Sequence, residues 1–139
     1  MKKLKKLLVA LLAATLMVSA LPLYASAAAI ENEVMPLWDN ANQILTDIAF
    51  ENGYGYAYAH VVGQLGVTNI SIDTYIYCLI DNEWVYMTEM HESKQSNTWG
   101  TECEFPVVDG WTYRADYTIT ITKDNIDEII NLTETQTYS

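Results

Sequence analysis

The sequence predicts an all-β domain, a β-sandwich of about seven or eight antiparallel strands, on two observations. From Ile44 onward apolar and polar residues alternate with a period of two, as in strands that cover a core with one face. Turn-forming residues interrupt the alternation about every 8–12 residues, as in sandwich folds. Sustained helical spacing is not found, and a helical turn over Asn125–Ile130 is the main exception we consider.

The expected strands follow one another between these turns. Asn52-Gly53, Asp81–Glu83, Asp109-Gly110 and Asp124-Asn125 supply the turns, together with the segment Gly63–Gly66. Glu92–Thr98 reads as a loose polar segment. The expected strands cover residues 44–50, 54–63, 67–80, 84–90, 99–107 and 111–122, with a last strand in 126–138, centred on 131–138.

The alternation also predicts which side chains point inward. One inward stripe runs from Ile70 to Ile80 and includes Cys78, and another runs from Trp99 to Val107 and includes Cys103. Ala57, Ala59 and Val61 form a third stripe of small residues. A closed barrel is the alternative all-β fold, but two inward cysteines favour a sandwich, in which they could meet across the core.

The N-terminus has the three parts of a secretory signal peptide, which we assign to residues 1–27. Four lysines precede an apolar run from Leu7 to Val18, and Ala25-Ser26-Ala27 is a cleavage motif, so we expect cleavage after Ala27. Cleavage after Ala28 or Ala29, or an uncleaved anchor, are the alternatives. A short leader, 28–42, then precedes the sandwich domain, 43–139. The expected location is outside a cell of the Gram-positive type.

Removal of the signal peptide leaves a strongly acidic chain. Three basic residues remain, Lys94, Arg114 and Lys123, against eighteen acidic ones, a net charge of −15. Such a chain repels nucleic acids and anionic membranes, which we therefore exclude as partners. Cys78 and Cys103 are the two cysteines, and an even count in an exported chain predicts a disulfide between them, with two free thiols as the alternative.

A set of motifs in a fixed order carries a resemblance to a known family. Met35-Pro36 and Gly55-Tyr56-Ala57 come first, and Val62-Gly63 with Gly66–Ile72 follows. Trp84, Val108-Asp109-Gly110, Tyr113-Arg114, Thr133-Glu134-Thr135 and Tyr138-Ser139 complete the order. Together they resemble a largely uncharacterised family of small secreted proteins of Firmicutes-type bacteria, over roughly residues 34–139. The resemblance implies an immunoglobulin-like β-sandwich and brings no catalytic residues.

The chain departs from this family in two respects. Where relatives have polar and basic residues, it has Tyr77, Cys78 and Leu79, and it is acidic where many relatives are rich in serine and lysine. A relative's partner is therefore not transferred. Tyr113, which follows Asp109-Gly110 near the start of a late strand, matches the tyrosine corner of immunoglobulin-type folds.

The outward tyrosines are the main candidates for binding a ligand. Tyr56, Tyr58, Tyr75 and Tyr77 would form an aromatic surface if their strands shared one sheet, and with tryptophans such a surface could stack on sugar rings. Cross-strand packing of tyrosine is the structural alternative. The candidate stacking residues are Trp84, Trp99, Tyr75 and Tyr77, and Trp111 is a further tryptophan that could join them.

Nucleotide, metal and catalytic sites are not supported by the sequence. Gly53 and Gly55 lead into a strand and lack a third glycine, so they do not form a dinucleotide loop. Glu89 and His91 share a strand face and give two ligands, too few for zinc. Glu102 and Glu104 lack a calcium-loop pattern. We expect neither a metal nor a cofactor, and no catalytic residues.

The sequence thus favours an exported, non-enzymatic domain that binds a protein or glycan ligand through loops or a sheet face. The alternative is a carbohydrate-binding module for cell-wall or environmental glycans, on account of the aromatic residues. A structural subunit that pairs through edge strands is a third hypothesis. The ligand and the oligomeric state stay open.

Overall fold

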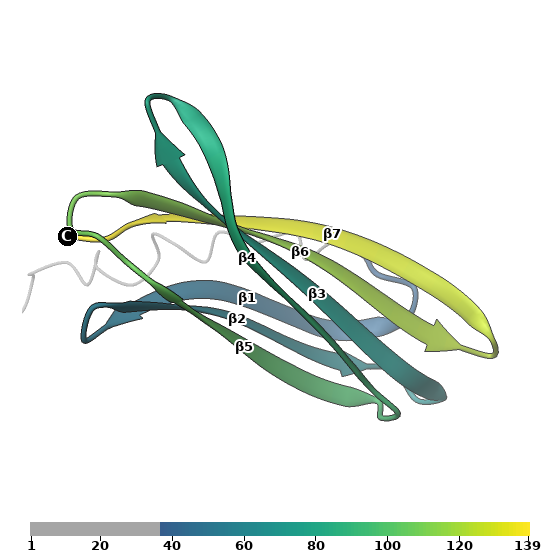
Figure 1. Cartoon of the computed structure of the whole chain (residues 1–139). Helices are drawn as coiled ribbons and strands as arrows, with labels where there is room; N and C mark the ends of the chain where they lie inside the picture. Colours follow the sequence, from purple (N-terminus) through teal and green to yellow (C-terminus); the bar gives the residue numbers. More distant parts are fainter. Residues whose placement is uncertain (1–36) are drawn as a thin grey trace, which may run out of the picture. The chain divides into compact units, whose positions relative to one another are not determined.

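Seven antiparallel strands form two sheets that pack face to face (Figure 1). The structure is a computed structural model and describes residues 37–139, so the predicted signal peptide, its cleavage site after Ala27 and Met35-Pro36 lie outside the described residues. The strands are β1 (Ala41–Glu51), β2 (Tyr54–Gly63), β3 (Val67–Ile80), β4 (Glu83–Lys94), β5 (Thr98–Pro106), β6 (Thr112–Lys123) and β7 (Ile126–Thr137).

One sheet has the order β1-β2-β5 and the other β4-β3-β6-β7, so the chain crosses between layers after β2, β4 and β5. We call them the three-stranded and the four-stranded sheet. This confirms the predicted all-β, immunoglobulin-like β-sandwich, with seven strands. Between residues 37 and 139 no helix has the length and apolar character needed to cross a membrane.

Three of the connections are tight hairpin turns that need positive φ at both central residues. Asn52 and Gly53 join β1 to β2 with φ of 52° and 81°. Asp81 and Asn82, and then Asp124 and Asn125, join β3 to β4 and β6 to β7 with φ between 51° and 66°. Asn, Asp and Gly adopt this left-handed region most readily, which is why these dipeptides stand at the turns.

The core lies between the inner faces of the two sheets, and β3 and β6 supply most of it. Ile70, Ile72 and Ile76 of β3 are fully buried, and the inward residues of β6 are at most 1% exposed. On the opposite sheet, Ala57, Ala59 and Val61 are also at most 1% exposed, as the alternation predicted. Small residues on β2 leave room for the large side chains that face them.

Tyr113 forms the predicted tyrosine corner. Its ring is 1% exposed and packs against Phe105 at 5.4 Å between centroids. Its hydroxyl accepts a hydrogen bond of 2.7 Å from the backbone N–H of Val108 in the preceding loop. In antibody domains a cysteine stands two residues after this tyrosine. Here Ala115 occupies that position and is fully buried, so the inter-sheet bond of those domains is absent.

The structure does not show the predicted disulfide. Cys78 and Cys103 are both buried, as expected, but both are free. Cys78 lies on β3 and Cys103 on β5, in different sheets. The Cys78 thiol donates to the carbonyl oxygen of Val85 on β4 at 3.8 Å, so its hydrogen bond is made within its own sheet.

Except for β2 and β3, the strand bounds also differ from the prediction, and three segments are informative. β7 begins at Ile126, the start of the predicted range, and not at Asn131, so the helical turn considered for Asn125–Ile130 does not form. β4 runs to Lys94 because Ile70 and Ser71 pair with Lys94 and Ser93, which turns the expected loose segment into strand. β1 begins at Ala41, so the predicted domain boundary at residue 43 falls inside a strand.

The β3–β4 hairpin projects from the sandwich (Figure 1). Ile76 pairs with Thr88 while Tyr77 pairs with Tyr86, so Met87 is an extra residue in β4 and forms a β-bulge. A bulge bends the strand and increases its twist. The hairpin beyond the bulge therefore turns away from the layer opposite, and its tip extends beyond the core.

Candidate functional site

The outward tyrosines fall into two separate groups. Tyr56 and Tyr58 lie on β2 in the three-stranded sheet, whereas Tyr75 and Tyr77 lie on β3 in the four-stranded sheet. The two sheets turn their outer faces in opposite directions, so the single surface that one shared sheet would have made is not formed. The chain instead carries two aromatic surfaces, and each has its own neighbours.

The outer face of the four-stranded sheet brings together three of the four predicted stacking residues. Tyr77 pairs with Tyr86 and with Arg114 across the strands, and Leu79 pairs with Trp84. The Arg114 guanidinium lies 4.5 Å from the Tyr77 ring centroid and 4.8 Å from that of Trp84. It also contacts the Asp116 carboxylate at 3.0 Å. One cation is thus held by two aromatic rings and a carboxylate.

The tip of the projecting hairpin exposes apolar side chains on both of its sides. Val85 is 43% exposed and Tyr86 is 51% exposed, and Ile80 at the end of β3 is 36% exposed. Val85 faces the same side as Cys78, whereas Tyr86 faces the side of Tyr77, against which its ring packs at 6.0 Å. We call the set Ile80, Trp84, Val85 and Tyr86 the hairpin surface.

His91 is held by two carboxylates farther along the same sheet. Its Nδ1 lies 2.9 Å from Asp73 and its Nε2 lies 3.3 Å from Glu89, while the Tyr75 ring packs edge-on against it. The hydrogen bonds that His91 donates to Asp73 and then to Glu89 raise its pKa above its ordinary value. Each carboxylate takes a different ring nitrogen, and the described residues contain no group of three or more side chains suited to a metal.

Trp99, the fourth predicted stacking residue, is apart from the other three. It lies on β5 in the three-stranded sheet, where it packs against the core and is partly buried. The Lys94 ammonium lies 4.5 Å from its ring centroid. Trp99 therefore has a cation of the chain itself over one ring face, at the edge where β4 and β5 approach each other.

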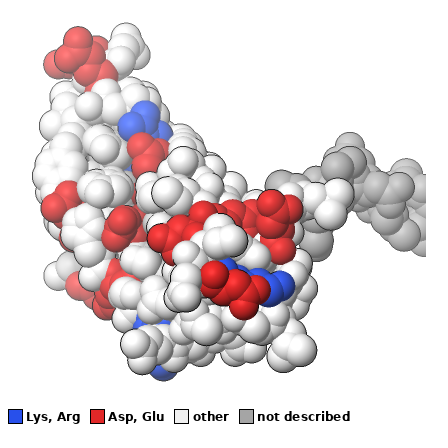
Figure 2. Space-filling view, turned by 90° about the vertical axis from the view of Figure 1, so that its right-hand side faces the viewer, with Lys and Arg blue, Asp and Glu red and all other residues white. Residues whose placement is uncertain are grey.

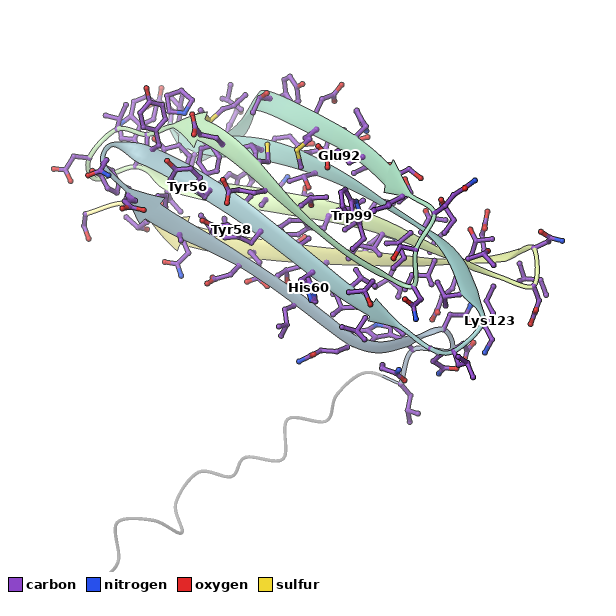
Figure 3. The ribbon with its side chains drawn as sticks, turned by 90° about the horizontal axis from the view of Figure 1, so that it is seen from below. Tyr56, Tyr58, His60, Glu92, Trp99 and Lys123 are labelled. Carbon is purple, nitrogen blue, oxygen red and sulfur yellow. The ribbon has the colours of Figure 1, made fainter. Side chains whose placement is uncertain are left out.

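The second aromatic surface is the outer face of the three-stranded sheet. The register places Tyr58 between Asp47 and Glu102, and Tyr56 between Ala49 and Glu104. The two rings stack at 6.3 Å, and Figure 3 shows Tyr56, Tyr58 and His60 in a row along β2. We call this surface the tyrosine face; its members are Leu45, Asp47, Tyr56, Tyr58, His60, Glu102 and Glu104.

The tyrosine face has a shallow hollow of about 440 Å³ at one end, and no sequence pattern predicted it. Leu45, Tyr58 and His60 line it together with Thr46 and Asp47. His60 lies across from Gly100, and a Cβ at residue 100 would come within 3.0 Å of the His60 ring. Glycine thus lets the imidazole lie against the strand, which leaves the hollow open beside it.

Carboxylates surround both tyrosines of this face. Partial burial is the first cause that raises the pKa of Tyr56 and of Tyr58, and charge is the second, from Glu104 and Glu102 respectively. The three basic residues of the described part are engaged elsewhere: Lys94 with Trp99, Arg114 with Asp116, and Lys123 with Gln64. Figure 2 shows how sparsely basic groups lie among acidic ones on one side of the molecule.

Among known proteins, similarity to this chain is found with solved structures. No family model matches the chain, and no curated protein matches it either. Two crystal structures of a Parabacteroides merdae β-glucuronidase are similar to it, with TM-scores of 0.41 and 0.39 and 11% sequence identity. The matches cover 69% and 70% of this chain but 13% of the enzyme chains. At this level the likeness carries no argument about function.

Proposed function

We propose that the protein is an exported, non-catalytic binding domain that recognises a protein partner through the hairpin surface. The exported location outside a Gram-positive-type cell and the kinship with small secreted Firmicutes-type proteins are parts of the same proposal, supported by the signal motif and by the order of the sequence motifs. The observation that carries it is the exposure of large apolar side chains on an element that projects from the sandwich.

The contrast along β3 supports this proposal. Ile70, Ile72 and Ile76 are fully buried, yet Ile80 on the same side of the same strand is 36% exposed. β3 is longer than the part of it that the three-stranded sheet covers, and its uncovered end places apolar side chains in solvent. Grouped apolar exposure of this kind marks interaction sites more often than single exposed residues do.

The chemistry of the hairpin surface favours a protein over a glycan. Tyrosine and tryptophan are the residues most enriched at protein interfaces, and Val85 and Ile80 add aliphatic area beside them. Sugar binding by stacking needs a free ring face. Arg114 covers one face of Tyr77 and one face of Trp84, so the chain itself uses part of the surface that a sugar would need.

Site-specific cross-linking tests the proposal in the producing cell. A photo-reactive residue at position 85 is expected to cross-link to one discrete protein, and Tyr86→Ser is expected to abolish the product. The matched control is position 129. Ile129 is an apolar residue with 63% exposure, and it lies on β7, the edge strand of this sheet opposite β4. Equal cross-linking from both positions, or none from position 85, overturns the proposal.

A glycan ligand is the alternative outcome of a parallel experiment. Binding of the protein to cell-wall or soluble glycans that Trp84→Ala removes, without a protein cross-link from position 85, would establish the carbohydrate-binding alternative. Trp111→Ala is the control, since Trp111 is a tryptophan of 39% exposure outside the strands and is not part of the hairpin surface.

A further inference from the structure

The tyrosine face is a second surface, rich in carboxylates, on the opposite side of the sandwich from the aromatic cluster around Arg114. Asp47, Glu102 and Glu104 are exposed on it, and Glu51 stands at the end of the same strand as Asp47. The described part of the chain places no lysine or arginine among them, because its three basic residues are engaged elsewhere. Its field therefore favours a cation.

We propose that the tyrosine face binds an extended, arginine- or lysine-rich segment of another polypeptide. This goes beyond the function proposed above, because it assigns a different surface and a partner of stated chemistry. Carboxylates provide the charge complement for the basic groups, and the Tyr56 and Tyr58 rings provide faces for cation–π contact. Leu45 and Tyr58, which line the hollow, offer apolar area for the aliphatic stem of a long basic side chain.

The chain itself shows that this combination holds a guanidinium. On the four-stranded sheet, Arg114 lies over the rings of Tyr77 and Trp84 and contacts the Asp116 carboxylate at 3.0 Å. The tyrosine face presents the same elements, two neighbouring rings on the outer face of a sheet with flanking carboxylates, but without the arginine. A basic side chain of a partner would complete the arrangement that Arg114 completes internally.

The spacing of the tyrosine face favours an extended peptide over a compact cation. Tyr56, Tyr58 and His60 are alternate residues of β2, so they repeat about every 6.8 Å along the strand, and the carboxylates of β5 repeat with them. Alternate residues of an extended peptide have the same repeat. A peptide with a basic residue at every second position could therefore place successive cations against successive rows of the face.

The test is the affinity of the secreted, purified protein for labelled peptides, measured by fluorescence anisotropy at low salt. The probe is a peptide of alternating arginine and serine. A peptide of the same composition with its arginines in one block tests the repeat, because in extended form half of its basic groups face away. Binding of the alternating peptide is expected to be the tighter of the two and to weaken as salt is added.

The variant Glu102→Gln/Glu104→Gln is expected to weaken binding of the alternating peptide about tenfold, the effect of losing two exposed ion pairs. Glu83→Gln/Glu92→Gln removes the same charge from exposed positions of β4 and is expected to change affinity less than about twofold. Tyr58→Ser is expected to weaken binding with the charge unchanged. Thermal melting of each variant shows that it is folded.

Three results would overturn the proposal: no binding by the wild type, equal loss in the two double variants, or equal affinity for the alternating and blocked peptides. The cross-linking variants at positions 85 and 86 leave the tyrosine face intact. Failure of this proposal and failure of the hairpin proposal are therefore separate results.

Discussion

Replacing Tyr113 by phenylalanine is expected to destabilise the sandwich through the loss of one hydroxyl group. The ring would stay in place, since Phe105 and Phe50 pack against it at 5.4 and 6.0 Å between centroids. What disappears is the acceptor for the Val108 N–H, at 2.7 Å. A buried donor left without an acceptor costs about 1–3 kcal/mol. Because the Val108 side chain is 50% exposed, water can reach part of this loop, and we expect about 1–2 kcal/mol.

Urea unfolding followed by tryptophan fluorescence measures this difference, with an unchanged slope indicating that both proteins unfold in the same way. Tyr54→Phe is the matched control, because it removes the same atom from a tyrosine that is 45% exposed. Its free energy of unfolding should stay within about 0.5 kcal/mol of the wild type. If Tyr113→Phe is as stable as Tyr54→Phe, the tyrosine corner does not stabilise the fold in the way we describe.

Two further predictions concern titratable groups. Asp73→Asn should lower the pKa of His91, because hydrogen bonds to Asp73 and then Glu89 raise that pKa above 6.5. NMR titration of the imidazole protons measures the pKa, and Asp109→Asn is the control. An unchanged His91 pKa in Asp73→Asn would contradict the ion pair. Since that pKa is raised on folding, the stabilisation it gives is complete below about pH 6.5 and is lost as pH rises through the raised value. Burial raises the pKa of the Cys103 thiol, so Ellman's reagent at neutral pH should react slowly with the native protein. Once the protein is unfolded, the reagent should react with both thiols. An unfolded protein without reactive thiols would show that Cys78 and Cys103 form a disulfide.

The sequence predicted β2 and β3 with their observed bounds because each combines strict alternation with turn residues at both ends. β7 was harder, since Ile129 and Ile130 are adjacent and break the period of two. Ile129 is 63% exposed and Ile130 is 8% exposed, so one of the two points into solvent. Pairing with β6 determines that this segment is a strand and which of the two isoleucines is buried, and no property of the segment alone reveals that pairing.

The candidate sites were less predictable than the fold. Alternation shows that Tyr58 and Tyr75 point outward, but it does not show that β2 and β3, although consecutive, lie in different sheets. The contact between Arg114 and Trp84 depends on strands that are distant in sequence, and the hollow beside His60 depends on the strand pairing that brings Gly100 next to it. The bulge at Met87, which turns the hairpin outward, could not be predicted from the sequence, because no glycine or proline lies beside it.

The two-residue turns also bear on how the chain acquires its fold. The β1–β2, β3–β4 and β6–β7 hairpins each join neighbouring segments, and such hairpins close in about 1–10 μs. In the four-stranded sheet, the pairing of β3 with β6 joins Val67 to Lys123. In the three-stranded sheet, β5 must pair with β2, from which β3 and β4 separate it in sequence. Long loops must close before these contacts form, so their formation should limit the folding rate. Until then the stripe of Ala57, Ala59 and Val61 stays in water, and the folding chain passes through a stage in which the hairpins have formed but the two sheets have not yet packed together.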